Sequence, residues 1–349
     1  MRAEFLIVGQ GLAGTALAWA LAERGRSFLS VDRDEPLTSS KVAAGLVTPV
    51  TGMRLNLNWR FGALHPEALA FYRDKERQLG RPFYFELPHV RLFKKQEEIA
   101  LWEKRVASPE VRRHVNFDAA APLVDEAVFT NPLGGFEQKD SGYLDTAAYL
   151  SASRAHFESI GAWERAEFLA ADTQAAPDGI VWRGRRFSTL VLCQGWEAAQ
   201  GAWLDWVPVQ SALGTVFSLS AAIREPRIIN RGCWLLPRRE GGFLAGPTYE
   251  LKFADPRTPS EKAVRDLDQR LHALVRAPFE ITGSQTAVRP IVRGCHALIG
   301  RHPSQPRVAF FNGLGSKGVL RAPFMARRLV EHLLDGAPLE AEYDLQRNF

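Results

Sequence analysis

Three glycines near the N-terminus have the spacing with the clearest chemical meaning. Gly9, Gly11 and Gly14 form the stretch GQGLAG, which follows an apolar, strand-like run at 4–8 and opens a helical pattern at 15–24. In such a turn the first glycine allows a tight bend, the second lets the backbone approach a pyrophosphate, and the third lets helix and strand pack closely. Free N–H groups at the start of the helix attract phosphate. The spacing therefore predicts a dinucleotide site.

An acidic residue follows where such a site requires one. The strand-like run 27–31 ends at Asp32, which completes a unit of strand, turn, helix and strand. A carboxylate at this place accepts hydrogen bonds from ribose hydroxyls and repels a 2′-phosphate, which disfavours NADP. The unit alone leaves FAD and NAD as alternatives.

A second glycine-rich turn lies near the C-terminus. Residues 311–323 read FNGLGSKGVLRAP, between a strand-like run at 307–311 and a helical pattern at 322–334. Backbone N–H groups in such a turn can bind a phosphate or approach the edge of a flat ring. From the residues alone, both a ligand site and a plain loop remain open.

The elements that must position these turns alternate between strand and helix near both ends of the chain. Residues 207–249 instead carry apolar runs broken by Gly and Pro, which is typical of an antiparallel sheet. We expect Asp145 and Ser260 to act as helix N-caps. Further helical patterns lie at 66–79, 101–107, 146–160 and 260–275.

This pattern predicts an α/β fold with two domains. A Rossmann-like nucleotide domain is built from both ends of the chain, and an α+β substrate domain on a mainly antiparallel sheet is inserted between them. The expected ranges are 1–80, 143–206 and 286–349 for the nucleotide domain, and 81–142 and 207–285 for the substrate domain.

Composition excludes several other classes of protein. The 349 residues are 46% hydrophobic and 24% charged, an ordinary globular balance. The net charge of +5 is spread along the chain, whereas a nucleic-acid-binding module needs a clustered basic stripe. Cys193, Cys233 and Cys295 are far apart and form no CxxC pair, so we expect neither a disulfide framework nor a metal site. Without a signal peptide or an apolar run of ~18 residues, we expect a cytoplasmic protein with no transmembrane segment.

Four segments resemble the D-amino-acid oxidase superfamily of FAD enzymes, and most of all its glycine oxidase and sarcosine oxidase branch. They are GQGLAG with Asp32, SSKVAAGLVTP (39–49), VRPIVRGCHALIGRHP (288–303) and NGLGSKGVLRAP (312–323). The stretch 232–246 is similar to the family's sheet strands above the flavin. The resemblance implies a GR2-type FAD domain. It also implies non-covalent FAD, since no residue convincingly matches the family's cysteine or histidine attachment point.

The resemblance also implies which residues contact FAD. Those of the N-terminal half are Gly9, Gly11, Leu12, Ala13, Gly14, Asp32, Arg33, Ser39, Ser40, Ala44, Gly45 and Leu46. Those of the remainder are Phe168, Gly195, Gly313, Leu314, Gly315, Ser316, Lys317 and Gly318. Phe168 is expected near the adenine, and the segment 313–318 at the pyrimidine edge of the flavin.

The implied reaction is oxidation of the C–N bond of a small amine or amino acid. Hydride passes to flavin N5, the imine hydrolyses, and O2 or another acceptor reoxidises the flavin. Arg289 matches the family arginine that clamps a substrate carboxylate, with Arg293 as the alternative. Trp234 and Tyr249 match positions that face the substrate, although each is also an ordinary core aromatic by type. Glycine oxidases place a tyrosine where this chain has Trp234, so glycine itself is not assigned as the substrate.

Other interpretations stay open at this stage. A NAD-dependent dehydrogenase would need no second glycine segment, and a non-catalytic FAD protein or partner subunit would use flavin only for its fold. The segment NGLGSKG also resembles the flavin domain of tRNA wobble-uridine modification enzymes, but no counterpart of their methyltransferase half is seen. His65, His296 and His302 show no partner in the sequence, so we assign them no catalytic role. Neither the role of Lys317 nor the oligomeric state is indicated.

Overall fold

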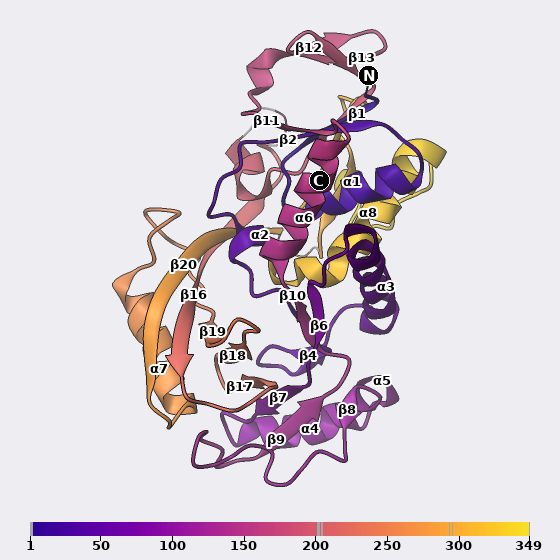
Figure 1. Cartoon of the computed structure of the whole chain (residues 1–349). Helices are drawn as coiled ribbons and strands as arrows, with labels where there is room; N and C mark the ends of the chain where they lie inside the picture. The colour runs from indigo at the N-terminus through magenta and orange to yellow at the C-terminus, as the bar shows by residue number, and fades with distance from the viewer. Residues whose placement is uncertain (1–2, 201–202, 204, 293, 295, 349) are drawn as a thin grey trace.

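The computed structural model describes residues 3–200, 203, 205–292, 294 and 296–348, and it has two regions (Figure 1). The upper region is built on a six-stranded sheet. Its strands are β1 (Phe5–Val8), β2 (Phe28–Asp32), β11 (Trp163–Arg165), β15 (Thr189–Leu192), β21 (Leu298–Arg301) and β22 (Val308–Asn312). Their order is β11-β2-β1-β15-β22-β21, and all neighbours are parallel except β21 and β22. Strands from both ends of the chain thus lie side by side, which confirms the predicted α/β fold.

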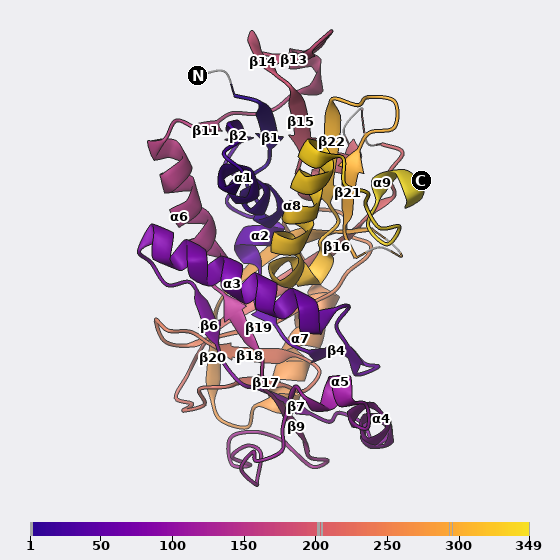
Figure 2. The ribbon, with the colours of Figure 1, turned by 90° about the vertical axis from the view of Figure 1, so that its right-hand side faces the viewer.

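Helices cover one face of this sheet. They are α1 (Leu12–Glu23), α3 (Phe61–Leu79), α6 (Thr146–Ser159) and α8 (Gly318–Asp335). Figure 2 shows α1 and α8 side by side with α3 running across them. Ile7 of β1, Trp19, Tyr72 and Met325 belong to one buried apolar cluster between sheet and helices. Burial of each such side chain contributes roughly 1.5–3 kcal/mol, so this layer holds α1 against the sheet.

The opposite face of the sheet is covered by a small antiparallel meander. Its strands are β12 (Thr173–Ala176), β13 (Gly179–Trp182) and β14 (Arg185–Phe187), and the short helices η2 (Gly195–Gln200) and α9 (Leu345–Asn348) lie nearby. Trp182 is fully buried against Leu6 and Leu190 of the sheet. The parallel strands are therefore apolar on both faces, as a covered parallel sheet requires.

The lower region contains an eight-stranded, mainly antiparallel sheet. Its strands are β7 (His89–Leu92), β8 (Val115–Asn116), β9 (Gly135–Gln138), β16 (Val209–Ala221), β17 (Ile228–Asn230), β18 (Trp234–Pro237), β19 (Phe243–Gly246) and β20 (Phe279–Val292). Their order is β20-β16-β19-β18-β17-β7-β9-β8, and β17 and β7 form the parallel pair. The amphipathic helix α7 (Glu261–Leu274) packs Leu267 and Leu271 on one face, against Phe217 and Ile229. The other face is turned toward the upper region.

Short elements join the two regions. They are α2 (Ser39–Val42), η3 (Gly315–Lys317), the three-stranded sheet β3 (Leu46–Val47), β10 (Gly142–Leu144), β6 (Tyr84–Glu86), and the pair β4 (Val50–Thr51), β5 (Asn56–Leu57). Helices α4 (Glu97–Val106) and α5 (Pro109–Arg112) belong to the lower region, where Trp102 and Val111 pack near Phe136 of β9, and η1 (Ala170–Asp172) leads into β12 of the meander. Strand β20 runs through the expected domain boundary at 285/286 and pairs with β16 of the eight-stranded sheet along its whole length.

Helix caps were predicted well and helix starts less well. The side chains of Asp145 and Ser260 accept the N–H groups of Ala148 and Ala263, so both are N-caps as expected. However, α3 and α8 begin several residues before the predicted 66 and 322, and both helices contain a proline. Proline removes one helical hydrogen bond and costs roughly 3 kcal/mol, which the buried residues of the early turns offset.

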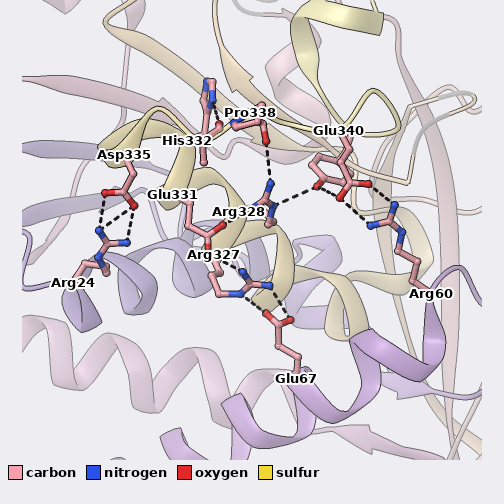
Figure 3. A network of polar contacts seen from close by, with 12 residues as sticks. Arg24, Arg60, Glu67, Arg327, Arg328, Glu331, His332, Asp335, Pro338 and Glu340 are labelled. Atoms are coloured by element: carbon pink, nitrogen blue, oxygen red, sulfur yellow. Dashed lines mark hydrogen bonds and ion pairs between the residues drawn. The ribbon is translucent and has the colours of Figure 1, made fainter.

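Exposed ion pairs connect the helices of the upper region (Figure 3). Arg24 of α1 pairs with Asp335 of α8, and Arg327 of α8 pairs with Glu67 of α3. Such partly exposed pairs contribute about 0–1 kcal/mol each, so the helices are held mainly by their apolar contacts.

Candidate functional site

Two cavities meet at the N-terminus of α1. One of about 180 Å³ lies over the ends of β1 and β2, and the other, about 300 Å³, lies between α1, the start of α8 and the eight-stranded sheet. Both are lined by Gly11, Ser39, Ser40, Cys193 and Gly195. They therefore form one elongated site, the shape that an extended dinucleotide requires.

The glycine turn leaves the start of α1 open to this site. Gly9 has φ +98°, and a Cβ there would lie 2.5 Å from the Cys193 carbonyl oxygen. A Cβ on Gly14 would lie 1.9 Å from the Gly9 oxygen. Helix α1 has no side-chain cap at Gly11, and Ser40 Oγ accepts the Leu12 N–H at 3.0 Å. The remaining N–H groups of the first turn suit a pyrophosphate, so this turn fits the group that the motif predicts.

Asp32 lies in the smaller cavity at the end of β2. Its carboxylate accepts the backbone N–H groups of Gln10 and Asp34, both at 2.6 Å. A carboxylate has about four acceptor positions, so capacity remains for ribose hydroxyls.

Arg33 and Phe168 line the same cavity. Arg33 forms an ion pair with Glu197 across the cavity, and Phe168 packs against Trp182 and Trp203. The cavity therefore combines an apolar wall with a polar rim, as an adenosine would need.

The larger cavity has two backbone-rich edges. Ala44, Gly45 and Leu46 form one edge; the other consists of Leu314, Gly315, Ser316 and Gly318. Gly45 has φ +68°, and a Cβ there would lie 1.9 Å from the Leu144 oxygen, so no larger residue fits. A flat ring could lie between the two edges.

Three of the predicted cofactor residues lie behind the cavity walls. Gly14 packs against Gly9, and Gly313 has φ +74° and donates its N–H to Asn312 Oδ1 at 2.8 Å. Lys317 lies outside both cavities, and burial followed by the nearby Arg321 lowers its pKa to about 8. These residues shape the turns without lining the two cavities.

Arg289 enters the larger cavity from β20. Its Nη1 donates a long hydrogen bond of 3.4 Å to the Thr248 oxygen, and no carboxylate among the described residues pairs with it. Burial lowers the pKa of the guanidinium, which means that the protein around it does not stabilise the charge. It is the sole formally charged side chain among the described residues that line this cavity.

Trp234 and Tyr249 also line the larger cavity. The Trp234 indole lies on the face of the sheet shared with Arg289, whereas Tyr249 is 58% exposed at the cavity mouth. The Arg289 guanidinium lies 6.0 Å from the centre of the Tyr249 ring. The structure therefore brings the three predicted catalytic residues together.

The histidines and cysteines have other surroundings. None of His65, His296 and His302 lines either cavity: the first two stack on Phe61 and Trp59, and His302 accepts backbone N–H groups of the loop that follows it. Burial raises the pKa of the thiol of Cys193 and, to about 11, that of Cys233. Cys295 and the alternative clamp Arg293 lie outside the described residues.

Sequence reasoning missed several lining residues. They include Gln10, Thr38, Trp196, Gly214, Val216 and Asn312. Gly214 carries a signal that could have been noticed, because a glycine inside an apolar strand marks a close approach. Among the residues described, no helix is long and apolar enough to cross a membrane, and no group of three His, Cys, Asp or Glu could hold a metal.

Three curated relatives match most of this chain. It is 23% identical to the uncharacterized oxidoreductase YurR of Bacillus subtilis (strain 168), over 95% of each chain. It is 26% identical to the tRNA 5-methylaminomethyl-2-thiouridine biosynthesis bifunctional protein MnmC of Azoarcus sp. (strain BH72), and 22% identical to the bifunctional protein ThiO/ThiG of Nostoc sp. (strain PCC 7120). The chain covers 58% and 55% of those two proteins, so it corresponds to little more than half of each.

Solved structures share the fold, and a family model spans the chain. Glycine oxidase from Geobacillus kaustophilus superposes with a TM-score of 0.77 at 18% identity, over 97% of this chain and 96% of that one. Iminodiacetate oxidase from Chelativorans sp. BNC1 superposes with a TM-score of 0.80 at 17% identity, over 97% of this chain and 98% of that one. The family described as FAD dependent oxidoreductase matches residues 4–332. The chain therefore belongs to this family of FAD-dependent oxidoreductases, as the sequence resemblance implied, and its cofactor is FAD.

Proposed function

We propose that the chain oxidises the C–N bond of a small amine or amino acid that carries a carboxylate, giving an imine that water hydrolyses. The names of the similar glycine oxidase and iminodiacetate oxidase support a substrate of this kind. A small-molecule partner, reoxidation by O2 or another acceptor, and a cytoplasmic location stay predictions from the sequence.

One observation carries the proposal: a guanidinium that no carboxylate among the described residues pairs with lies in the larger cavity. A cation surrounded by protein but unpaired is costly, and an anionic ligand removes that cost. Arg289 has a planar group that can make two parallel charge-assisted bonds to a carboxylate. A substrate carboxylate is the anion that fits this place.

We propose that FAD is held along the two cavities by the residues that the sequence indicated. The turn at Gly9–Gly14 and Ser40 would hold the pyrophosphate and Asp32 a ribose. The ring would lie between the edge at 44–46 and the edge formed by Leu314, Gly315, Ser316 and Gly318. When bound, FAD supplies the acceptor for the two electrons that leave the substrate as hydride. We likewise propose the division into an FAD domain (1–80, 143–206, 286–349) and a substrate domain (81–142, 207–285).

The chain's own contribution is to bind and orient the substrate. Arg289 would fix the carboxylate and thereby the position of the α-carbon, which contributes through proximity. An amine that arrives neutral can give up hydride without a strong base to remove a proton from its nitrogen. No histidine, lysine, aspartate or glutamate is among the described residues that line the larger cavity, which agrees with a reaction that needs no strong base.

Anaerobic flavin bleaching tests the proposal. The purified protein should absorb near ~450 nm, and a panel of amino acids and N-methylated amines should include a compound that bleaches this band. We expect that compound to carry a carboxylate. Bleaching only by amines without a carboxylate, or by no compound of the panel, would contradict the proposed function.

A further inference from the structure

The strands β16 and β20 place a glycine beneath Arg289. In their antiparallel register Ala212 pairs with Arg289 and Gly214 pairs with Ala287. Gly214 is therefore the diagonal neighbour of Arg289 on the same face of the sheet, within reach of a long side chain. Both residues line the larger cavity.

The guanidinium occupies the space that a side chain at position 214 would take. A Cβ built on Gly214 would lie 2.1 Å from Nη2, 2.2 Å from Cζ and 2.2 Å from Nη1 of Arg289. Real Cβ contacts essentially never fall below 3.0 Å. The obstructing atoms are the far end of a flexible side chain, so a methyl group would displace the guanidinium rather than prevent the strands from pairing.

The glycines of this sheet differ in how much space a Cβ would have. Gly246 of β19 lies beneath the Trp234 indole, where a Cβ would be 3.2 Å from Cζ2 and 3.3 Å from the Thr215 oxygen. That contact is tight but requires only a small shift. By contrast, Gly283 of β20 has nothing within 4 Å of its Cβ position, so it serves as a matched control on the same strand as Arg289.

We propose that Gly214 is a positioning residue: it determines how close to the sheet the Arg289 guanidinium lies when it binds the substrate carboxylate. Its missing side chain leaves the space over position 214 to the Arg289 guanidinium, which fixes where a substrate carboxylate can bind. This inference rests on the proposed function, because it assigns Gly214 a role through the carboxylate-binding role of Arg289. A displacement of about 1 Å costs ~10²-fold in a reaction that depends on orientation, so the effect should be measurable.

The test compares three variants: Gly214→Ala, Gly283→Ala and Arg289→Ala. For the best amino acid of the anaerobic panel and for its methyl ester, which lacks the carboxylate, KM and kcat are measured. The Kd of acetate, a carboxylate that is not oxidised, is measured by calorimetry. We expect Gly214→Ala to raise the KM of the acid and the Kd of acetate ~10-fold or more. The ester kinetics, the FAD content and the melting temperature should stay at wild-type values, as should every property of Gly283→Ala.

The outcomes separate this inference from the proposed function. Suppose that Arg289→Ala raises the KM of the amino acid and the Kd of acetate, whereas Gly214→Ala leaves both constants within ~2-fold of wild type. The positioning role of Gly214 is then wrong, and the role of Arg289 in binding the carboxylate stands. If Gly214→Ala impairs acid and ester equally, or lowers the FAD content, its role is structural and the inference also fails. If Arg289→Ala leaves the KM of the amino acid and the Kd of acetate unchanged, Arg289 does not bind the carboxylate, and both proposals are wrong.

Discussion

The glycine turn at the start of α1 and the sheet face below Arg289 use glycine in opposite ways. In the turn, a Cβ on Gly9 or Gly14 would strike backbone oxygen, at 2.5 Å and 1.9 Å. On the sheet, a Cβ on Gly214 would strike the end of a side chain, at 2.1 Å. The first region is thus shaped by rigid backbone and the second by movable side chains. A fold of this kind can keep one cofactor site while the substrate site above it changes.

The largest effect is expected in the turn, since backbone cannot yield. Gly9→Ala adds a Cβ at φ +98° and 2.5 Å from the Cys193 oxygen, and strain of this kind costs about 1–3 kcal/mol. We expect the flavin content of the purified protein to fall ~10-fold or more, measured as the ratio of flavin to protein absorbance.

Gly62→Ala is the control for that variant. Gly62 lies in α3, and nothing is within 4 Å of its Cβ position. It should bind FAD as the wild type does. Full flavin content in Gly9→Ala would contradict the contrast between the two regions, because the backbone of the turn would then accommodate a Cβ as the side chains on the sheet do.

Acid should affect His89 of the sheet region at a pH at which the ion pairs of Asp34 in the nucleotide region still hold. Burial, and then Arg91 and Lys317, lower the pKa of His89 in β7 to about 3, whereas Arg154 and Lys41 hold the pKa of Asp34 at about 2. Below pH 6.5 the unfolded chain protonates His89 while the folded chain does not, so stability falls as the pH decreases from 6.5 toward 3. The ion-paired Asp34 loses its contribution only below pH ~4.

Urea unfolding at pH 7 and pH 5 measures this difference. Between these values, His89 should account for a loss of about 2 kcal/mol in the free energy of unfolding. Over the same pH interval, the free energy of unfolding of His89→Gln should decrease by about 2 kcal/mol less than that of the wild type. Equal losses in the two proteins would show that His89 is not held neutral by burial.

The smallest effect is expected where the two regions touch at the surface. Arg257, in the loop between β19 and α7, pairs with Glu35 of the nucleotide region at 3.0 Å, with their side chains 65% and 28% exposed. Arg257→Ala should change the free energy of unfolding by less than ~1 kcal/mol and KM by less than ~2-fold, because exposed pairs are screened. A larger change in KM would mean that this contact controls access to the cavity.

Features that depend on near neighbours in the chain could be predicted from the sequence, whereas features that depend on tertiary packing could not. The turn at Gly9–Gly14, Asp32 and the caps Asp145 and Ser260 are set by near neighbours in the chain, and the structure has them as expected. The starts of α3 and α8 were missed because burial in the core overrides the local effect of proline. Gly214 was missed because its meaning depends on the pairing of β16 with β20.

Arg289 occupies an intermediate place. Its residue type and spacing left a structural ion pair open, and only the family resemblance favoured a carboxylate clamp. The structure adds that no described carboxylate pairs with it inside the larger cavity. That absence depends on tertiary arrangement, so it could not be read from the sequence.

The most direct measurement is the half-saturating concentration for anaerobic flavin bleaching by an amino acid and by its methyl ester, in the wild type and in Arg289→Ala. Removal of a buried charge that pairs with the substrate should raise the value for the acid by ~10²-fold or more and leave the ester nearly unchanged. This result would establish that Arg289 binds the carboxylate of a substrate that reduces the flavin. Equal values for the acid in the two proteins would contradict the account.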